Sequence, residues 1–263
     1  MLIERVEGAF PRLSGAARVL EVFRRLASQP DGSSLGELAR GVNAPKSSVH
    51  RDLRLLRQAG LVTEVHGGRY RYSYEFFRLV FNCYEEIDEV ARIRPLLLTL
   101  AHRFGETVHY AILDGGDVVY LAKIEAPGRG LKLSSAVGGR NPAYCTGVGK
   151  ALLAFSCPVD DDVRRFVKDN GPLAARTPNT LIDGEALVRE LKGVRKAGYA
   201  LDCEESELGI NCLAVPLFLG PRRLPTGAIS VTALSTRMSK RDLEASVPEV
   251  RAIVTATLGD VLP

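Results

Sequence analysis

The sequence contains few of the residues and motifs on which metal sites and common hydrolases depend. Its four histidines and five cysteines do not pair at metal-ligand spacing, which argues against a structural zinc site. It has no HExxH motif, and no Cys–His pair stands out by its spacing. We therefore expect no metal, no cofactor and no enzymatic activity.

The sequence also lacks the marks of a secreted or membrane-bound chain. The cysteines are odd in number and form no CxxC pair, and no secretory signal peptide is recognisable. Reduced thiols in a cytoplasmic protein are expected from these features. No apolar run approaches the roughly 20 residues that a transmembrane helix needs, so no membrane partner is expected.

Charge is unevenly distributed along the 263 residues, a length that suggests one or two domains. The formal net charge is +4; residues 1–75 contain 12 Lys/Arg and 8 Asp/Glu, and the remainder contains 23 of each. The whole positive excess therefore lies in the N-terminal part. A basic region of this kind is suited to contacts with nucleic-acid phosphates.

Residues 34–72 have the pattern of a winged helix-turn-helix. Ser34 and Glu37 form a capping box at a helix start, and 43–45 interrupt the chain before a second helix, with Pro45 expected at its first position. Val49, Leu53 and Leu56 form an apolar stripe on that second helix. The opposite face is basic and rich in hydroxyls, which suits a DNA major groove. The candidate DNA-binding residues of this region are Ser34, Lys46, Ser47, Ser48, His50, Arg51 and Arg54.

A helix before this motif and a hairpin after it complete the predicted domain, residues 1–75. The first helix is expected to cover the other two with an apolar face made of Ala16, Val19, Leu20, Phe23, Leu26 and Ala27. Strands at 61–65 and 69–72 flank the turn His66-Gly67-Gly68. Alternation along the second strand puts Arg69 and Arg71 on one face, where they are candidates for phosphate contact, and the tyrosines on the other.

Residues 76–104 carry two amphipathic patterns, one around Phe77 and Phe81 and one around Ile93 and Leu97. Either these are helices packed on their own domains, or they form a linker and dimerisation segment. The second reading is preferred, because apolar side chains near a domain boundary are rarely left exposed and dimeric DNA binders need a spacer between half-sites.

From residue 105 to 263 the pattern is α+β. A hairpin is predicted over 107–113 and 118–124, and a second strand pair over 213–219 and 227–234. Helices are predicted at about 148–155, 160–168, 184–197 and 239–258. An antiparallel sheet flanked by helices is a common architecture for small-molecule sensors, although fold alone does not fix function.

The stretch 143–154 is the most informative part of this second domain. A P-loop is excluded because Tyr144 occupies the first glycine position and Ala151 the position of the magnesium-binding hydroxyl. Thr146-Gly147-Val148 opens a helix, so free amides and the helix dipole could attract an anion such as a carboxylate. An ordinary glycine-rich turn with a threonine cap explains the same residues, and the two readings stay open. Cys145 could also act as a catalytic thiolate, and Asp202, Glu204 and Glu205 could act as acid/base carboxylates. The preferred interpretation is that Cys145 is a packing residue and that the three acids are solvated.

Five segments in order give the chain a resemblance to the IclR-type bacterial transcriptional regulators along nearly its full length. They are 45–51, 105–108, 146–154, 198–202 followed by Glu204-Glu205 and Leu208-Gly209, and 227–231. The resemblance implies a winged helix, a linker helix and a GAF-like sensor domain that binds small carboxylates. It further implies that the ligand carboxylate meets the amides of Gly147 and Val148, and that Asp202, Cys212, Ser230 and Thr232 line the rest of the pocket.

The function expected from residues and resemblance together is that of a homodimeric regulator, or a dimer of dimers. It would bind a double-stranded DNA operator under the control of a small organic acid effector. Two alternatives remain at this point: an enzyme of small-acid metabolism with an accessory DNA-binding domain, and a constitutive DNA-binding dimer without effector. Turnover of an acid would favour the first, and a collapsed cavity around Cys212 the second.

Overall fold

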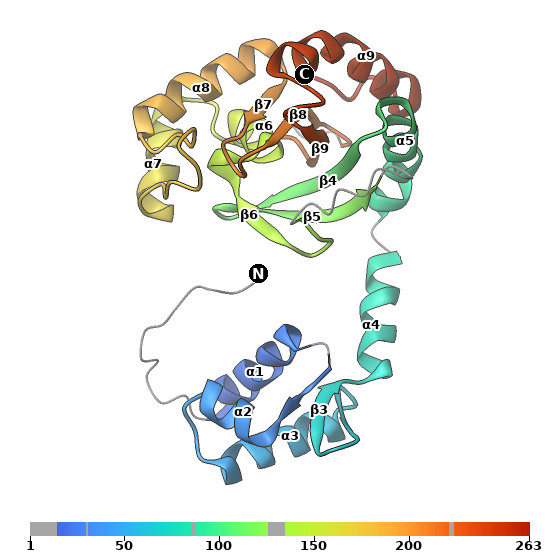
Figure 1. The fold of residues 1–263 in the computed structure, drawn as a ribbon, viewed down its shortest axis with the longest axis vertical. Helices are drawn as coiled ribbons and strands as arrows, with labels where there is room; N and C mark the ends of the chain where they lie inside the picture. The colour runs from blue at the N-terminus through green and yellow to red at the C-terminus, as the bar shows by residue number, and fades with distance from the viewer. Residues whose placement is uncertain (1–14, 30, 86–87, 126–134, 221–223) are drawn as a thin grey trace. The chain divides into compact units, whose positions relative to one another are not determined.

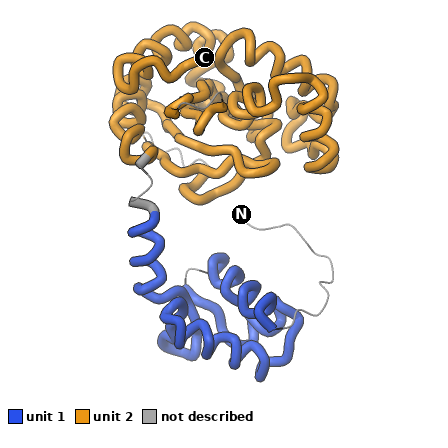
Figure 2. Tube along the Cα trace, turned by 180° about the vertical axis from the view of Figure 1, so that it is seen from behind, with its two compact units in different colours: residues 1–87 blue, residues 88–263 orange. Residues whose placement is uncertain are grey.

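The computed structural model describes residues 15–29, 31–85, 88–125, 135–220 and 224–263. The chain divides into two compact units, residues 1–87 and 88–263 (Figures 1 and 2). No helix among the described residues has the length and apolarity to cross a lipid bilayer.

Unit 1 is the winged helix-turn-helix that the sequence predicts (Figure 1). Its elements are α1 Gly15–Arg25, a 3-10 turn at Leu26–Ser28, β1 Ser33–Ser34, α2 Leu35–Gly41, α3 Lys46–Gln58, β2 Val62–Val65, β3 Arg69–Tyr72 and α4 Tyr74–Glu85. The three short strands form an antiparallel sheet in the order β1-β3-β2. The turn between β2 and β3 needs Gly67 and Gly68, whose φ angles of 79° and 68° are rarely adopted by other residues.

The sequence predicts the start of α2 correctly, but it misplaces the start of α3 by one residue. The capping box is confirmed: the Glu37 amide donates to Ser34 Oγ at 3.2 Å, and the Ser34 amide donates to Glu37 Oε2 at 2.7 Å. The position of Pro45 is wrong by one residue, since it is the N-cap of α3 and not its first helical residue.

The predicted apolar face of the first helix is confirmed in part: Leu26 is buried, and Val19 and Phe23 pack half-buried against the same core. Leu20 is 62% exposed, and Ala16 and Ala27 are exposed as well. Val22 and Arg18 are buried in their place. The reason is an ion pair: the Arg18 guanidinium donates to both carboxylate oxygens of Asp52 on α3, at 2.6 and 3.1 Å. α1 therefore docks on α3 through a buried charge pair flanked by apolar contacts.

The segment 76–104, expected as one linker, is split between the two units. Phe76 packs in unit 1, with its ring centroid 5.2 Å from that of Phe23 and 4.6 Å from that of Tyr72. Further along α4, Val80 and Phe81 are 42% and 59% exposed. The second half is α5, Asp88–Phe104, whose four central apolar side chains are fully buried within unit 2: Ile93, Leu96, Leu97 and Leu100.

Unit 2 is built on a six-stranded antiparallel sheet in the order β6-β5-β4-β9-β8-β7. Its elements after α5 are β4 Thr107–Asp114, β5 Asp117–Ile124, β6 Arg140–Pro142, a 3-10 turn at Ala143–Cys145, α6 Gly147–Ser156, α7 Asp160–Asn170, α8 Gly184–Ala197, β7 Ala200–Cys203, β8 Ile210–Leu217, β9 Gly227–Leu234 and α9 Lys240–Leu258. The predicted α+β sensor fold is confirmed, while the short edge strands β6 and β7 were not predicted.

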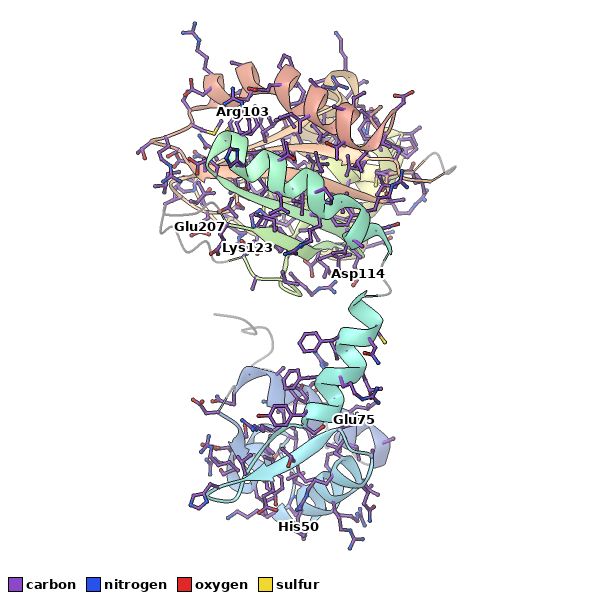
Figure 3. The ribbon with its side chains drawn as sticks, turned by 90° about the vertical axis from the view of Figure 1, so that its right-hand side faces the viewer. His50, Glu75, Arg103, Asp114, Lys123 and Glu207 are labelled. Carbon is purple, nitrogen blue, oxygen red and sulfur yellow. The ribbon has the colours of Figure 1, made fainter. Side chains whose placement is uncertain are left out.

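Helices cover the sheet, and α6 and α8 share a core with one of its faces. Four alanines on that face belong to the core: Ala111, Ala200, Ala214 and Ala228. α5 and α9 also pack on the strands, and they are joined by Arg103, whose Nε lies 2.5 Å from Glu249 Oε1 (Figures 1 and 3). The small alanine side chains let the backbone of α6 approach the sheet closely.

We predict that Asp52→Asn destabilises unit 1 by about 3–5 kcal/mol, because it leaves the buried Arg18 guanidinium without its counter-charge. Hydrogen exchange of the α1 and α3 amides in the full chain would measure the change. Glu64→Gln is the matched control, because Glu64 pairs with Arg57 on the surface at 2.7 Å and such pairs contribute about 1 kcal/mol or less. Equal protection in the two variants would contradict the assigned role of the Arg18–Asp52 pair.

Candidate functional site

Strand register brings polar side chains from four strands of unit 2 into one row. Asp202 on β7 lies opposite Cys212 on β8, and Cys212 lies opposite Thr232 on β9. Ser230, two residues before Thr232, lies opposite His109 on β4. Residues two apart on a strand share a face, so this row lies on the same face as the alanines under α6.

The N-terminus of α6 faces this row. Thr146 caps the helix, with its Oγ1 accepting from the Gly149 amide at 3.2 Å and its carbonyl accepting from the Lys150 amide at 2.9 Å. The amides of Gly147 and Val148 donate no hydrogen bond to any described residue. Two free amides at the positive end of a helix are a suitable site for an anion.

A cavity of about 40 Å³ lies between α6 and the polar row. All six residues that the sequence assigns to an effector site line it, and the residues Gly147, Val148, Asp202, Cys212, Ser230 and Thr232 thus converge. The remaining lining residues are His109, Tyr120, Ser135, Asn141, Thr146, Ser206, Glu207 and Ile210. The geometry that the sequence argument requires is therefore present, and the role of these residues in binding stays a prediction.

His109 is the most informative lining residue that sequence reasoning missed. It is 2% exposed, and burial, with a contribution from the Lys123 ammonium, lowers its pKa to about 3. Its Nε2 lies 2.8 Å from Ser135 Oγ. A histidine within the largely apolar run 107–113 was the available signal, but only the pairing of β4 with β9 shows which side chains it meets.

Asp202 is held in place by the loop that follows β7. Its Oδ1 accepts from the Glu205 amide at 2.8 Å and from the Ser206 amide at 3.3 Å, and its Oδ2 accepts from the Ser206 hydroxyl. Burial raises the pKa of Asp202, and these hydrogen bonds oppose the rise. The expectation of a solvated acidic cluster is wrong for Asp202 and Glu205, which are 2% and 8% exposed.

Beneath the turn, the fully buried Lys150 joins α6 to this loop and to α8. Its Nζ lies 2.5 Å from Glu205 Oε1 and 2.8 Å from Glu190 Oε1. The two carboxylates raise the pKa of Lys150 despite its burial, whereas burial raises the pKa of Glu205 to about 7 against the pull of Lys150. Burial is the main cause of the raised pKa of Glu205, and the negative charges of Asp202 and Glu190 add to it.

Cys145, considered above as an activated thiolate, does not have the required environment. It is fully buried, and burial raises the pKa of its thiol to about 12, so it is a packing residue at neutral pH. No group of three or more metal-ligating side chains occurs within the residues that the structure describes.

In unit 1, α3 presents the predicted basic face to solvent. Lys46, Ser47, His50, Arg51 and Arg54 are exposed, and Ser48 is half-buried; His50 lies at the margin of the unit in Figure 3. Two acidic side chains of this unit, Asp52 and Glu37, could have paired with Arg51 or Arg54, but both have other partners among the described residues. Asp52 binds Arg18, and Glu37 binds the Ser34 amide and lies 3.6 Å from Arg69.

The two arginines of the wing differ in their surroundings. The Arg69 guanidinium donates to the carbonyl oxygen of Gly32, with Nε at 3.0 Å. The Arg71 guanidinium lies 5.7 Å from the centroid of the exposed Tyr74 ring. Arg71 is therefore the freer of the two for phosphate contact, although both assignments stay predictions.

Both units match one family of known proteins. Residues 82–257 match the family described as "Bacterial transcriptional regulator IclR C-terminal", and residues 15–66 match the "IclR helix-turn-helix domain". The chain belongs to the IclR family. It is thus a DNA-binding transcriptional regulator of the IclR type, as the resemblance suggested.

Individual IclR-family proteins resemble the chain over most of their length. It is 29% identical to the HTH-type transcriptional regulator XynR of Escherichia coli, covering 89% of this chain and 91% of that protein. It is 33% identical to the HTH-type transcriptional regulator BhcR of Paracoccus denitrificans, covering 87% and 80%. The crystal structure of the Thermotoga maritima IclR superposes with a TM-score of 0.73 at 27% identity, covering 92% and 97%. Since such relatives are named as regulators, the enzyme alternative is set aside.

We predict that Glu205→Gln changes the pH dependence of stability of this IclR-family regulator. Because the folded-state pKa of Glu205 is about 7, above the ordinary value of about 4.3, the folded state binds more protons between these values. The Glu205 contribution to the free energy of unfolding therefore falls as pH rises from about 4.5 to 7, by up to about 3 kcal/mol.

Melting temperatures of wild type and Glu205→Gln from pH 4.5 to 8 would test this. The difference between them should change through the window and become constant above it. Glu244→Gln, at an exposed position on α9, should give a curve parallel to wild type. Parallel curves for Glu205→Gln would show that this carboxyl group does not titrate there.

Proposed function

We propose that a small carboxylate effector binds in the cavity of unit 2 and controls the affinity of this IclR-family regulator for its DNA operator. The observation that carries the proposal is the pair of free amides of Gly147 and Val148 at the N-terminus of α6, facing a polar cavity. Buried amides of this kind stabilise a bound anion, and no cationic side chain is needed. Effector binding is typical of the family, which supports the assignment.

Two features of the site favour a bound carboxylate over a cavity that is filled by the protein's own side chains. The cavity beside Cys212 is lined mainly by polar residues, whereas a constitutive dimer would need no such space. Lys150, directly below the turn, is neutralised by Glu190 and Glu205, so it holds the turn and the 202–206 loop together without attracting an anion itself. The ligand charge would thus be recognised by the amides.

On the DNA side, the exposed face of α3 is proposed to enter the major groove. Arg51 and Arg54 project from its middle, away from the stripe formed by Val49 and Leu53. Arginine in this position can donate two hydrogen bonds to guanine, while Lys46, Ser47, Ser48 and His50 would contact phosphates and base edges. Ser34 and Arg71 would contact the flanking backbone, and Arg69 would first have to release Gly32.

We propose that the regulator acts as a homodimer, with the exposed apolar face of α4 contributing to self-association. Phe77, Val80 and Phe81 are each more than 40% exposed, and covering such a patch stabilises an interface. An effector that binds one arrangement of the dimer better than the other shifts the spacing of the two winged helices. Operator affinity would change with that spacing.

The direct test is a thermal-shift screen of the full chain with aliphatic and aromatic carboxylates, followed by DNA titration with the acids that stabilise it. A ligand that binds only the native state raises the melting temperature by mass action. The proposal requires at least one acid that both stabilises the chain and changes its affinity for a duplex selected by the protein from a random pool. Stabilisation without a change in DNA affinity would contradict it.

We expect Arg51→Ala and Arg54→Ala each to weaken binding to the selected duplex by about 1–3 kcal/mol, since each removes a proposed base contact. Arg57→Ala is the matched control on the same helix, because Arg57 is paired with Glu64. Gel-shift titration at fixed salt gives the affinities. Unchanged binding by both variants, with melting temperatures equal to wild type, would rule out this docking of α3.

Two substitutions at Gly147 would distinguish the effect of losing its amide N–H from the effect of adding a side-chain carbon. A Cβ at this position lies 2.9 Å from Cys212 Sγ, so Gly147→Ala displaces the thiol but keeps the amide. Gly147→Pro adds the same carbon and removes the amide, at the first helical position where proline is tolerated. We expect Gly147→Pro to bind the carboxylate more weakly than Gly147→Ala by about 1.5–3 kcal/mol, with DNA binding retained in both.

Isothermal titration with an acid found in the screen would measure this difference. Gly193→Ala on α8, where a Cβ meets no atom within 4 Å, serves as the control with wild-type affinity. Equal affinities for Gly147→Ala and Gly147→Pro would mean that the amide does not hold the ligand.

A further inference from the structure

One apolar side chain of α3 takes no part in the core of unit 1. Leu55 is 49% exposed. The other three apolar side chains of this helix are at most 5% exposed; they are Val49, Leu53 and Leu56. Among the described residues of unit 1, Leu55 belongs neither to the buried core nor to the partly buried side chains packed against it. Packing of the unit therefore gives no reason for a leucine at this position.

Leu55 lies at the edge of the face that α3 presents to solvent. It follows Arg51 by four residues and Arg54 by one, and all three side chains are exposed. Residues four apart are neighbours on a helix surface, about 40° apart around the axis and about 6 Å apart along it. Leu55 therefore stands one turn beyond Arg51, on the helix that His50 marks in Figure 3.

Entry of this face into a major groove would remove the Leu55 side chain from water. Single leucines at a protein surface are common and indicate nothing by themselves, but a leucine inside the groove lies against the edges of bases. Most groups on these edges are hydrogen-bond donors or acceptors, and beside an apolar side chain they lose their water partners. The exception is the C5-methyl group of thymine, the only methyl group that the four bases present in the major groove.

We propose that Leu55 is a specificity-determining residue that contacts the C5-methyl group of a thymine in the operator. This inference rests on the proposed function, in which α3 enters the major groove and Arg51 and Arg54 contact base edges. Base pairs follow one another at about 3.4 Å, so the thymine lies within about two base pairs of the base that Arg51 contacts.

The face of α3 would then read the operator in two chemically different ways. The guanidinium groups of Arg51 and Arg54 donate hydrogen bonds, and they favour the two acceptors of guanine. The side chain of Leu55 has neither donor nor acceptor, so it favours an A·T pair with its methyl group. A G·C pair at the same position would place an amino group or a carbonyl oxygen against the leucine, without a hydrogen-bond partner.

The test uses the full chain and a duplex that the protein selects from a random pool. Each thymine of that duplex is replaced in turn by deoxyuridine, which lacks the C5-methyl group and keeps every hydrogen-bonding group of the base. We expect at least one position at which this replacement weakens binding about fourfold, which is ~0.8 kcal/mol and corresponds to one buried methyl group. Gel-shift titration at fixed salt measures both affinities.

Substitution of Leu55 assigns this preference to its side chain. Leu55→Ala removes the contacting methyl groups and keeps a good helix former, so the ratio of thymine affinity to uracil affinity should fall from about four to about one. Leu55→Met keeps an apolar side chain of similar volume, and its ratio should stay at about two or more. Each ratio compares two duplexes with the same protein sample, so a partial loss of folded protein cancels.

Leu20→Ala is the matched control for these variants. Leu20 is also an exposed leucine, at 62%, but it lies on α1 and not on α3. Its replacement should leave the ratio of thymine affinity to uracil affinity at the wild-type value. A ratio lowered as much by Leu20→Ala as by Leu55→Ala would mean that the preference does not come from Leu55.

The outcomes distinguish the role of Leu55 from the docking of α3 on which it rests. Wild-type binding that deoxyuridine weakens at no position would overturn the role of Leu55 alone, and so would a ratio unchanged in Leu55→Ala. A selected duplex without an A·T pair near the position at which Arg51→Ala loses its base preference would do the same. Unchanged DNA affinity in both Arg51→Ala and Arg54→Ala would overturn the docking, and the Leu55 inference with it.

Discussion

The close approach of α6 to the sheet is the constraint on which the arrangement of unit 2 depends. Four alanines of the sheet share its core, and a Cβ at Gly147 would lie 2.9 Å from Cys212 Sγ and 3.4 Å from Ala214 Cβ, both on β8. A helix with larger residues at these positions could not lie so near the strands, and its first amides would not face the polar row. The same sheet face thus changes from alanine to hydrogen-bonding side chains where α6 begins, and the cavity occupies that boundary.

Both units use a buried charge pair to fix one helix against another element. Arg18 and Asp52 join α1 to α3 in unit 1, while Lys150 joins α6 to Glu205 and Glu190 in unit 2. Apolar side chains of similar volume could provide comparable stability, but a charge pair tolerates fewer alternative orientations. In each unit the helix held in this way is the one that presents the candidate binding groups.

The local features were predictable from the sequence, whereas features that depend on pairing were not. The capping box, the glycine turn of the wing and the helix at 147–156 follow from neighbouring residues, so they were predicted nearly to the residue. The predicted face of the first helix was right for Val19, Phe23 and Leu26 but missed Arg18, because Arg18 is buried through its ion pair with Asp52, 34 positions away. Spacing placed Ser230 and Thr232 on one face, and the family resemblance supplied Asp202 and Cys212. His109 was missed because its neighbours are set by the register of β4 against β9.

The free amides at the start of α6 also have a consequence for how the two binding reactions depend on ionic strength. Binding of DNA by lysines and arginines releases counterions, so its affinity falls steeply as salt rises. A carboxylate held by buried amides, with no exposed cation involved, is screened far less. In the proposed mechanism, a rise in salt concentration therefore weakens DNA binding by the winged helix-turn-helix domain but hardly changes binding of a carboxylate in the cavity of unit 2. The regulator would then release its operator while still carrying its ligand.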